Sequence, residues 1–129
     1  WKTQINENGK APAYWSSLPE LDHNEIVGWT AHPGLGRDSI AVVFLRDSAD
    51  HPRTALRATL TRDLIAPVVE VAGEVSSSGS SVLARLFSLA VVGDLVSVGL
   101  AERSGSDPVP VAIIEDLKRR LTEQPGGSE

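Results

Sequence analysis

The sequence lacks cysteine and methionine altogether. Without cysteine, the 129-residue chain forms no disulfide, no thiolate metal site and no thiol nucleophile. The absence of methionine even at position 1 indicates that a segment before Trp1 has been removed or lies outside the sequence. A cleaved signal peptide and a longer N-terminus both stay open. With no targeting segment in view, we expect a cytoplasmic protein.

Positive charge is also scarce. Lys and Arg number 12 and Asp and Glu number 17, which gives a net charge of −5. Proteins that bind nucleic acid rely on clustered basic residues to neutralise phosphates, so we expect no nucleic-acid partner. The three consecutive bases Lys118 to Arg120 lie beside acidic residues and are interpreted as a solvated helix face. With 41% hydrophobic and 22% charged residues, the composition is that of one globular domain.

One long apolar run stands out. The twenty residues from Val82 to Ala101 contain only two charges, Arg85 and Asp94. A membrane span needs roughly 20 apolar residues, but a mid-span charge costs about 2.5–3.5 kcal/mol and no basic cluster flanks this run. We therefore expect no membrane span. A glycine after helical spacing is a usual stop signal, so Gly93 predicts a helix that turns into a buried strand near Leu95 to Leu100.

The remaining patterns complete the fold prediction. Strands are predicted over residues 26–30, 40–45 and 55–61, and helices over 65–75, with a strand at 64–75 as the alternative, and over 108–121. This order predicts an α+β fold, with a small antiparallel sheet of about four strands and two to three helices packed on one face. The predicted organisation is an irregular aromatic-containing arm at 1–24, a single domain at 25–123 and a flexible tail at 124–129.

Aromatic residues are few and concentrated at the N-terminal end. Trp1, Tyr14, Trp15 and Trp29 all lie within the first 29 residues. Large aromatic side chains dominate both cores and interfaces, so these residues either cover the core of their own domain or dock on another chain. We predict all four as interaction residues.

No catalytic residue, metal site or cofactor is predicted. His23, His32 and His51 fall in predicted loops, without the close spacing that a metal site requires. A short glycine-containing segment makes Gly34, Gly36 and Arg37 candidates for ligand binding. A phosphate-binding loop normally follows a strand and precedes a helix, whereas here a strand is predicted after the segment.

The favoured function is a non-catalytic protein–protein interaction domain, either a homo-oligomer or a subunit of a larger assembly. An aliphatic core, an aromatic arm and surplus apolar surface motivate this hypothesis, which implies a protein partner or self-association. The first alternative is a small-molecule binding or sensing domain with a pocket lined by Trp29 or Phe44. The second is an enzyme whose loops bring His32, His51 and Asp50 together.

Overall fold

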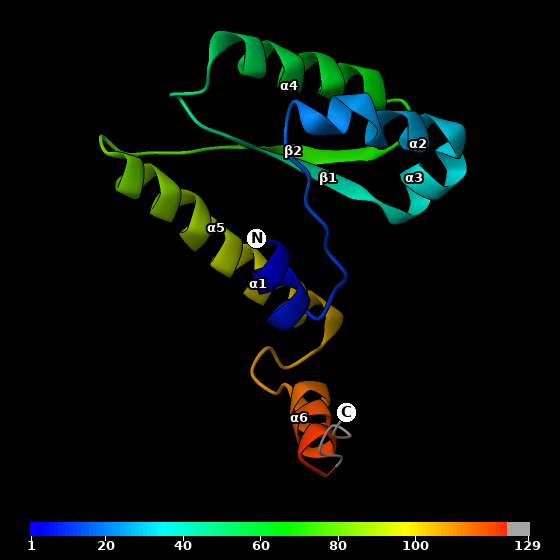
Figure 1. Cartoon of the computed structure of the whole chain (residues 1–129), viewed down its shortest axis with the longest axis vertical. Helices are drawn as coiled ribbons and strands as arrows, with labels where there is room; N and C mark the ends of the chain where they lie inside the picture. The colour runs from blue at the N-terminus through cyan, green and yellow to red at the C-terminus, as the bar shows by residue number, and fades with distance from the viewer. Residues whose placement is uncertain (124–129) are drawn as a thin grey trace, which may run out of the picture. The chain divides into compact units, whose positions relative to one another are not determined.

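A computed structural model describes residues 1–123, with every side chain except those of Pro33, Leu35 and Ala72. The predicted tail at 124–129 lies outside the described residues. The elements in chain order are α1 (Lys2–Glu7), η1 (Glu20–His23), α2 (Glu25–Ala31), α3 (Pro33–Ser39), β1 (Ala41–Arg46), α4 (Pro52–Ile65), β2 (Glu70–Ser76), α5 (Val82–Ser104) and α6 (Ala112–Glu123) (Figure 1). They form two compact units: unit 1 combines residues 1–13 with the chain from Gly93 onward, and unit 2 comprises residues 14–92.

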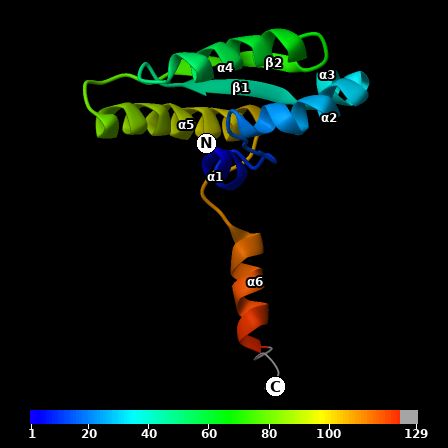
Figure 2. The ribbon, with the colours of Figure 1, turned by 45° about the horizontal axis from the view of Figure 1, so that its top comes forward.

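The sheet lies in unit 2 and is parallel. β1 and β2 pair from Ala41–Glu70 to Arg46–Ser76, and α4 provides the crossover that parallel neighbours require (Figures 1 and 2). The prediction of an α+β fold with an antiparallel sheet of about four strands is therefore wrong. Within the described residues the arrangement is α/β with two parallel strands, and the strands expected at 26–30 and 55–61 lie in α2 and α4.

The helical period of α4 explains one of these errors. Its buried residues Ala58, Thr61 and Ile65 recur at spacings of three and four, which places them on one helix face. Leu56 and Leu60 stay exposed, so the alternation over residues 55–61 does not mark the buried face of a strand. The helix begins at Pro52, where the missing amide proton costs nothing.

The segment before α5 shows the opposite error. The helix predicted over 65–75 is wrong, and the strand alternative is right for the part that forms β2. The i, i+3, i+4 spacing of valines in this segment is also compatible with a valine-rich strand, which such β-branched residues favour. The strand predicted at 40–45 is confirmed as β1, one residue further along.

The core of unit 2 occupies one face of the sheet. It consists of Phe44 from β1, Ala58 and Ile65 from α4, and Val69, with Trp29 of α2 among the half-buried side chains packed against it. On the other face of β1, Val43 and Leu45 remain 38% and 42% exposed. β1 is therefore apolar on both faces, as strands of a sheet covered on both sides are, but only one of its faces is well covered.

The apolar run forms one continuous helix, α5, so the predicted break at Gly93 and the strand after it are wrong. Gly93 is required by close packing in unit 1, because an added Cβ would lie 2.6 Å from Cδ1 of the Trp1 ring. Ser81 caps the start of the helix, because its Oγ accepts a hydrogen bond from the Ala84 amide at 3.1 Å.

Within unit 1, α1 packs on the second half of α5. Asn8 donates to Ser97 Oγ at 3.2 Å, and Gln4 donates to Asp94 Oδ1 at 2.6 Å. These contacts place a helix at residues 2–7, where the sequence shows no sustained period. The domain boundaries at 24 and 123 stay predictions.

The length and composition of α5 would suffice for a membrane span, and no other helix in residues 1–123 meets that test. This criterion is weak on its own, because core helices of globular domains also meet it. In unit 1, Gly93, Ser97 and Ala101 are buried along one face of the helix.

We predict that Ile65→Ala lowers the free energy of unfolding by about 2–5 kcal/mol, because it leaves a cavity at a fully buried position. Leu64→Ala is the matched control, since Leu64 is 64% exposed and its removal should cost about 0.5 kcal/mol or less. Urea denaturation followed by circular dichroism measures both. Equal losses for the two variants would contradict the assignment of the core to this face of α4.

A second prediction compares two glycines of α5. Gly99→Ala should stabilise the protein by about 0.5–1 kcal/mol through helix propensity, because no atom lies within 4 Å of the added Cβ. Gly93→Ala should instead destabilise it and shift the emission of Trp1, since the new methyl group displaces the indole ring. Urea titration and tryptophan fluorescence measure the two effects. A stabilising Gly93→Ala would show that the indole does not pack on this helix.

Candidate functional site

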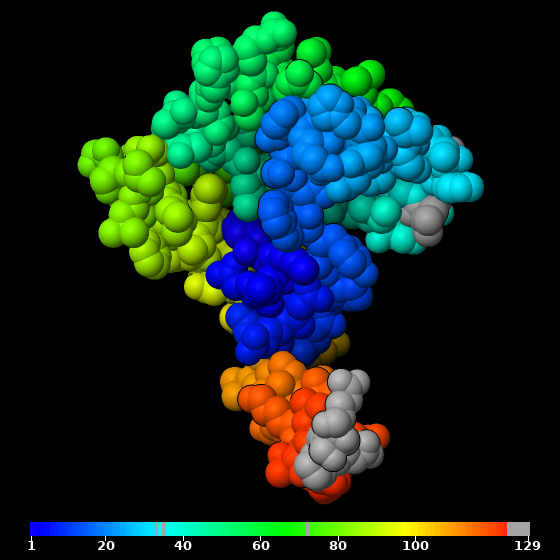
Figure 3. Space-filling view, viewed as in Figure 1, coloured from blue at the N-terminus to red at the C-terminus, as the bar shows by residue number. Residues whose placement is uncertain are grey.

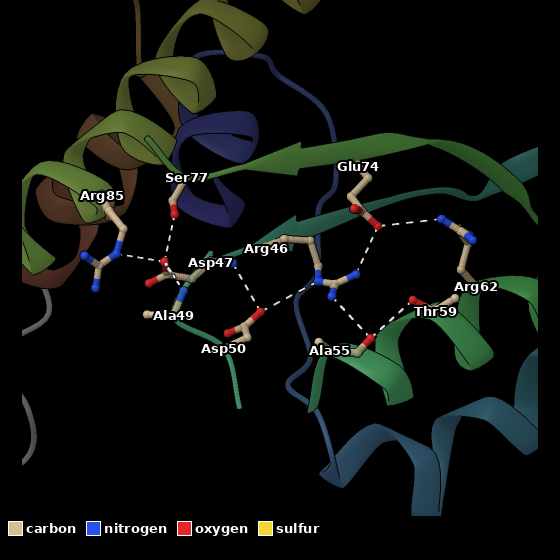
Figure 4. Close-up of polar contacts among 10 residues, drawn as sticks. All are labelled: Arg46, Asp47, Ala49, Asp50, Ala55, Thr59, Arg62, Glu74, Ser77 and Arg85. Carbon is tan, nitrogen blue, oxygen red and sulfur yellow. Dashed lines mark hydrogen bonds and ion pairs between the residues drawn. The ribbon is translucent and has the colours of Figure 1, made fainter. Parts of the chain in front are cut away.

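The carboxyl edge of the β1–β2 sheet gathers six charged side chains of unit 2 (Figure 4). β1 ends at Arg46 and β2 at Ser76, and the loops that follow lead directly into α4 and α5. Ligands of parallel α/β sheets bind at this edge, where helix N-termini attract anions. A binding site of unit 2 is therefore expected at this edge.

Arg46 ties three elements together at this edge. Its Nη1 lies 3.1 Å from Glu74 Oε2 on β2, and its Nη2 donates to the Ala55 carbonyl of α4 at 3.2 Å. Asp50 in the loop before α4 lies 3.7 Å from Arg46 Nε. Arg62 of α4 also approaches Glu74, with its Nη1 3.8 Å from Oε2. The guanidinium of Arg46 therefore joins both strands to the crossover helix.

Asp47, the residue after β1, accepts donors from three directions. Ser77 Oγ donates to its Oδ1 at 2.9 Å, the Ala49 amide donates at 3.1 Å, and Arg85 Nε of α5 lies 2.8 Å away. The Ala49 amide lowers the pKa of the Asp47 carboxyl most, followed by the Ser77 hydroxyl, and the charge of Arg85 acts in the same direction. Asp47 is therefore held in its ionised form.

Taken together, this edge is a clamp of paired charges, in which the buried Nε atoms of Arg46 and Arg85 lie near carboxylates without making a hydrogen bond. Three arginines face three carboxylates, namely Arg46, Arg62 and Arg85 with Asp47, Asp50 and Glu74. The hydroxyl, amide and guanidinium that would otherwise receive an anionic ligand are directed at Asp47. Nδ1 of His51 is likewise occupied, because it accepts the Arg53 amide at the start of α4. The geometry thus favours a structural role over an open anion cradle.

The clamp escaped the sequence analysis, although a signal was present. Asp47 follows one apolar run directly, and Ser77 begins the serine-rich stretch that follows the next valine-rich segment. If both segments had been recognised as parallel strands, their polar ends would have been expected at one edge. The helix assigned to residues 65–75 removed that expectation.

The predicted ligand-binding residues lie on α3 and serve packing. Gly36 is buried, and an added Cβ would collide with the Val68 carbonyl oxygen. The Arg37 guanidinium donates to the carbonyl of Pro67. Gly34 lies on the same short helix, exposed, with no atom close to the position of a Cβ. Ligand binding by these three residues stays a prediction.

Of the four predicted interaction residues, two are partly buried within their own chain and two are exposed. Trp1 packs on Gly93 in unit 1, and Trp29 packs against the core of unit 2. Tyr14 and Trp15 are 89% and 71% exposed. Two of the four therefore take part in the packing of their own chain, and the role of Tyr14 and Trp15 in an interface stays a prediction.

His23 differs from a mobile surface histidine because its backbone is anchored on both sides. On one side, Asp22 accepts a hydrogen bond from buried Thr61 at 2.8 Å and lies 3.1 Å from Arg57 on α4. On the other, Asn24 caps α2 through its side-chain oxygen. The His23 ring is exposed and bonds to no residue of the described chain. This arrangement presents a free imidazole on a rigid support.

Unit 1 has a shallow hollow of about 140 Å³ between α1 and the start of α6. Glu7 and Lys10 line it, and Lys10 Nζ donates to the carbonyls of Pro108 and Pro110 at 3.2 and 2.6 Å. Lys10 thereby holds the segment before α6 against α1. The sequence gives no signal of this hollow, because a lone acid and a lone lysine in a polar segment form no recognisable pattern.

Replacing Asp47 with asparagine should destabilise the protein in a pH-dependent way. The pKa of Asp47 is lower in the folded state than in the unfolded state. Its contribution to folding stability is therefore fully present at pH values above the ordinary aspartate pKa, and it is lost as the pH falls through the folded-state pKa. The gap in melting temperature between wild type and Asp47→Asn should therefore be wide at pH 7 and close below about pH 4. Asp63→Asn, at an exposed ion pair with Arg62, is the control and should change the melting temperature little at either pH. A gap that is constant with pH would refute the ionic role of Asp47.

Comparison with known proteins places these features in context. The chain is 47% identical over 123 residues to a bifunctional phosphoglucose/phosphomannose isomerase of Caldicellulosiruptor bescii, which covers 95% of this chain and 36% of the relative. The enzyme of the same name from Aquifex aeolicus is 44% identical over 94% of this chain and 37% of its own length. A D-glucosamine-6-phosphate 4-epimerase of Sulfolobus acidocaldarius is 28% identical over 93% of this chain. The chain thus spans a little over a third of the length of the curated relatives it matches.

These relatives overturn the functional hypothesis. Because the most similar of these proteins are named isomerases, the expectation of a non-catalytic interaction domain that is not an enzyme is wrong. The error arose because no catalytic motif is visible in a region that covers only part of each relative.

No solved structure matches the chain significantly. A family model does, the bacterial phospho-glucose isomerase C-terminal SIS domain, which matches residues 1–121. SIS domains have a Rossmann-like α/β fold, in agreement with the parallel strands β1 and β2 and their crossover helix. The chain belongs to the family of bacterial phosphoglucose isomerase C-terminal SIS domains.

Proposed function

We propose that this chain is the C-terminal domain of a sugar-phosphate isomerase that interconverts phosphorylated aldoses and ketoses of the glucose and mannose series. The observation that carries this proposal is the 47% and 44% identity, across nearly the whole chain, to two enzymes named phosphoglucose/phosphomannose isomerase. Glucose and mannose phosphates differ only in configuration at C2. One active site that removes the proton from C2 can therefore convert both aldose phosphates into the same ketose phosphate.

The chemistry requires a group that moves protons. An aldose becomes a ketose when a base takes the proton from C2 and a proton is delivered to C1, while a second proton moves between the two oxygens. The electrons balance within the sugar, so the step itself needs no external oxidant or reductant. An imidazole titrates near neutral pH and performs such transfers well.

His23 is the side chain of unit 2 that best fits this task. Catalytic groups work on rigid supports, and the backbone at His23 is fixed by Asp22 and Asn24. His51 is less suitable because its Nδ1 caps α4. His32, between α2 and α3, makes no capping bond that would fix its position. We therefore assign His23 as the acid–base candidate of this domain.

The charge of sugar phosphates also supports a cytoplasmic location. Sugar phosphates are charged metabolites that membranes retain inside the cell, and the relatives are named for acting on them. We propose a cytoplasmic protein on this basis.

The test uses a chimera in which this chain replaces the region it matches in the C. bescii isomerase. The chimera should convert glucose and mannose phosphates into the same ketose phosphate. Glucosamine 6-phosphate should be unchanged at C4, because the relative named as a 4-epimerase is only 28% identical. A chimera that folds, as judged by circular dichroism, and acts only on glucosamine 6-phosphate would replace the proposal with the epimerase function.

Within the chimera, His23→Asn should lower kcat by about 10²–10⁴-fold, because a general acid–base contributes a factor of that order. His32→Asn should leave kcat within about threefold, as a change outside the reacting geometry does. Steady-state kinetics measures both, with melting temperatures to confirm that each variant is folded. Equal kcat values for the two folded variants would remove His23 from the mechanism.

A further inference from the structure

The first half of α5 presents an apolar surface that the described chain leaves uncovered. Five of its side chains are more than half exposed, and their spacing spreads them over one half of the helix circumference: Val82, Leu83, Leu86, Phe87 and Val91. We call these five residues the outer face of α5. The yellow-green atoms of this helix are open to view in Figure 3. Exposed apolar patches of this kind usually mark an interface.

The charges around this helix do not suit a lipid surface. Arg85 is the only charged residue among residues 82–92, and it turns inward to Asp47 at 2.8 Å. A helix that lies on a membrane has Lys and Arg along its polar side, and residues 82–92 of α5 contain no basic residue besides Arg85. The outer face, with four aliphatic side chains and one phenylalanine, instead resembles the apolar core of an obligate protein interface.

The face of the sheet opposite the core is also incompletely packed. Strands of parallel sheets are normally packed on both faces, yet Val43 and Leu45 of β1 remain partly exposed opposite the core. A two-stranded sheet is also small for an independent fold. More polypeptide is therefore expected against unit 2.

We infer that the outer face of α5 is the docking surface for the polypeptide that precedes this region in the longer relatives. This chain covers only 36% and 37% of the two most similar of these isomerases, so almost two thirds of such a protein is left to cover it. The family description names a C-terminal domain, which places that remainder on the N-terminal side.

The inference rests on membership of the family and not on the substrate, so it stands or falls independently of the isomerase assay. The absence of cysteine from this chain provides a direct test. Phe87→Cys and Leu83→Cys introduce single thiols on the outer face, and Arg53→Cys introduces one at an exposed position on α4 as the control. Labelling rates with a maleimide are compared between the isolated 129-residue chain and the chimera, with peptide mass spectrometry locating the label.

In the isolated dilute chain, all three thiols should react at similar rates. In the chimera, labelling at positions 83 and 87 should slow by about tenfold or more, while labelling at position 53 stays unchanged. If the labelling rates at positions 83 and 87 fall as the concentration of the isolated chain rises, a second copy covers the surface. If they fall only when phosphatidylcholine–phosphatidylglycerol vesicles are added, a lipid surface covers it. Either result, or unchanged rates in the chimera, would overturn the inference.

Discussion

The parallel pairing of β1 and β2 is the constraint on which the rest of unit 2 depends. Two strands that run in the same direction cannot be joined by a hairpin, so the chain must return along the sheet, and α4 is that return. The crossover buries Ala58 and Ile65 against Phe44, and it also brings the ends of both strands to one edge. Arg46 then secures this arrangement through contacts with β2 and α4.

Local patterns predicted the elements whose stability is local. The apolar run at 40–45 is a strand, and the stripe of Ile113, Leu117 and Leu121 is on a helix, α6. Neither assignment requires knowledge of a distant partner. The misassigned segments at 26–30, 55–61, 65–75 and 95–100 are those whose pattern fits both periods, and only tertiary packing decides between them.

Gly93 illustrates why such a decision is out of reach of one sequence. A glycine inside an apolar run is compatible with a helix end or with a close contact, and the spacing is the same in both cases. The contact partner, Trp1, is 92 positions away in the sequence and shows no pattern that links it to α5. The orientation of the strands was equally hidden, because apolarity alone does not distinguish parallel from antiparallel neighbours.

The tertiary contacts of the predicted ligand-binding residues and histidines were hidden for a related reason. Gly34, Gly36 and Arg37 resemble a binding loop in composition, but Gly36 and Arg37 hold α3 against the segment before β2. His23 was noticed among the histidines, whereas the feature that separates it from the other two is the anchoring of Asp22 by Thr61, 39 positions later. The functional class came from relatives, of whose length this chain matches only a little over a third.

The neutral clamp at the carboxyl edge also has a consequence for encounter kinetics. Three paired cations and three paired anions project almost no field beyond a Debye length, which is about 8 Å at physiological ionic strength. A doubly charged phosphate that diffuses past this edge is neither accelerated nor oriented by it.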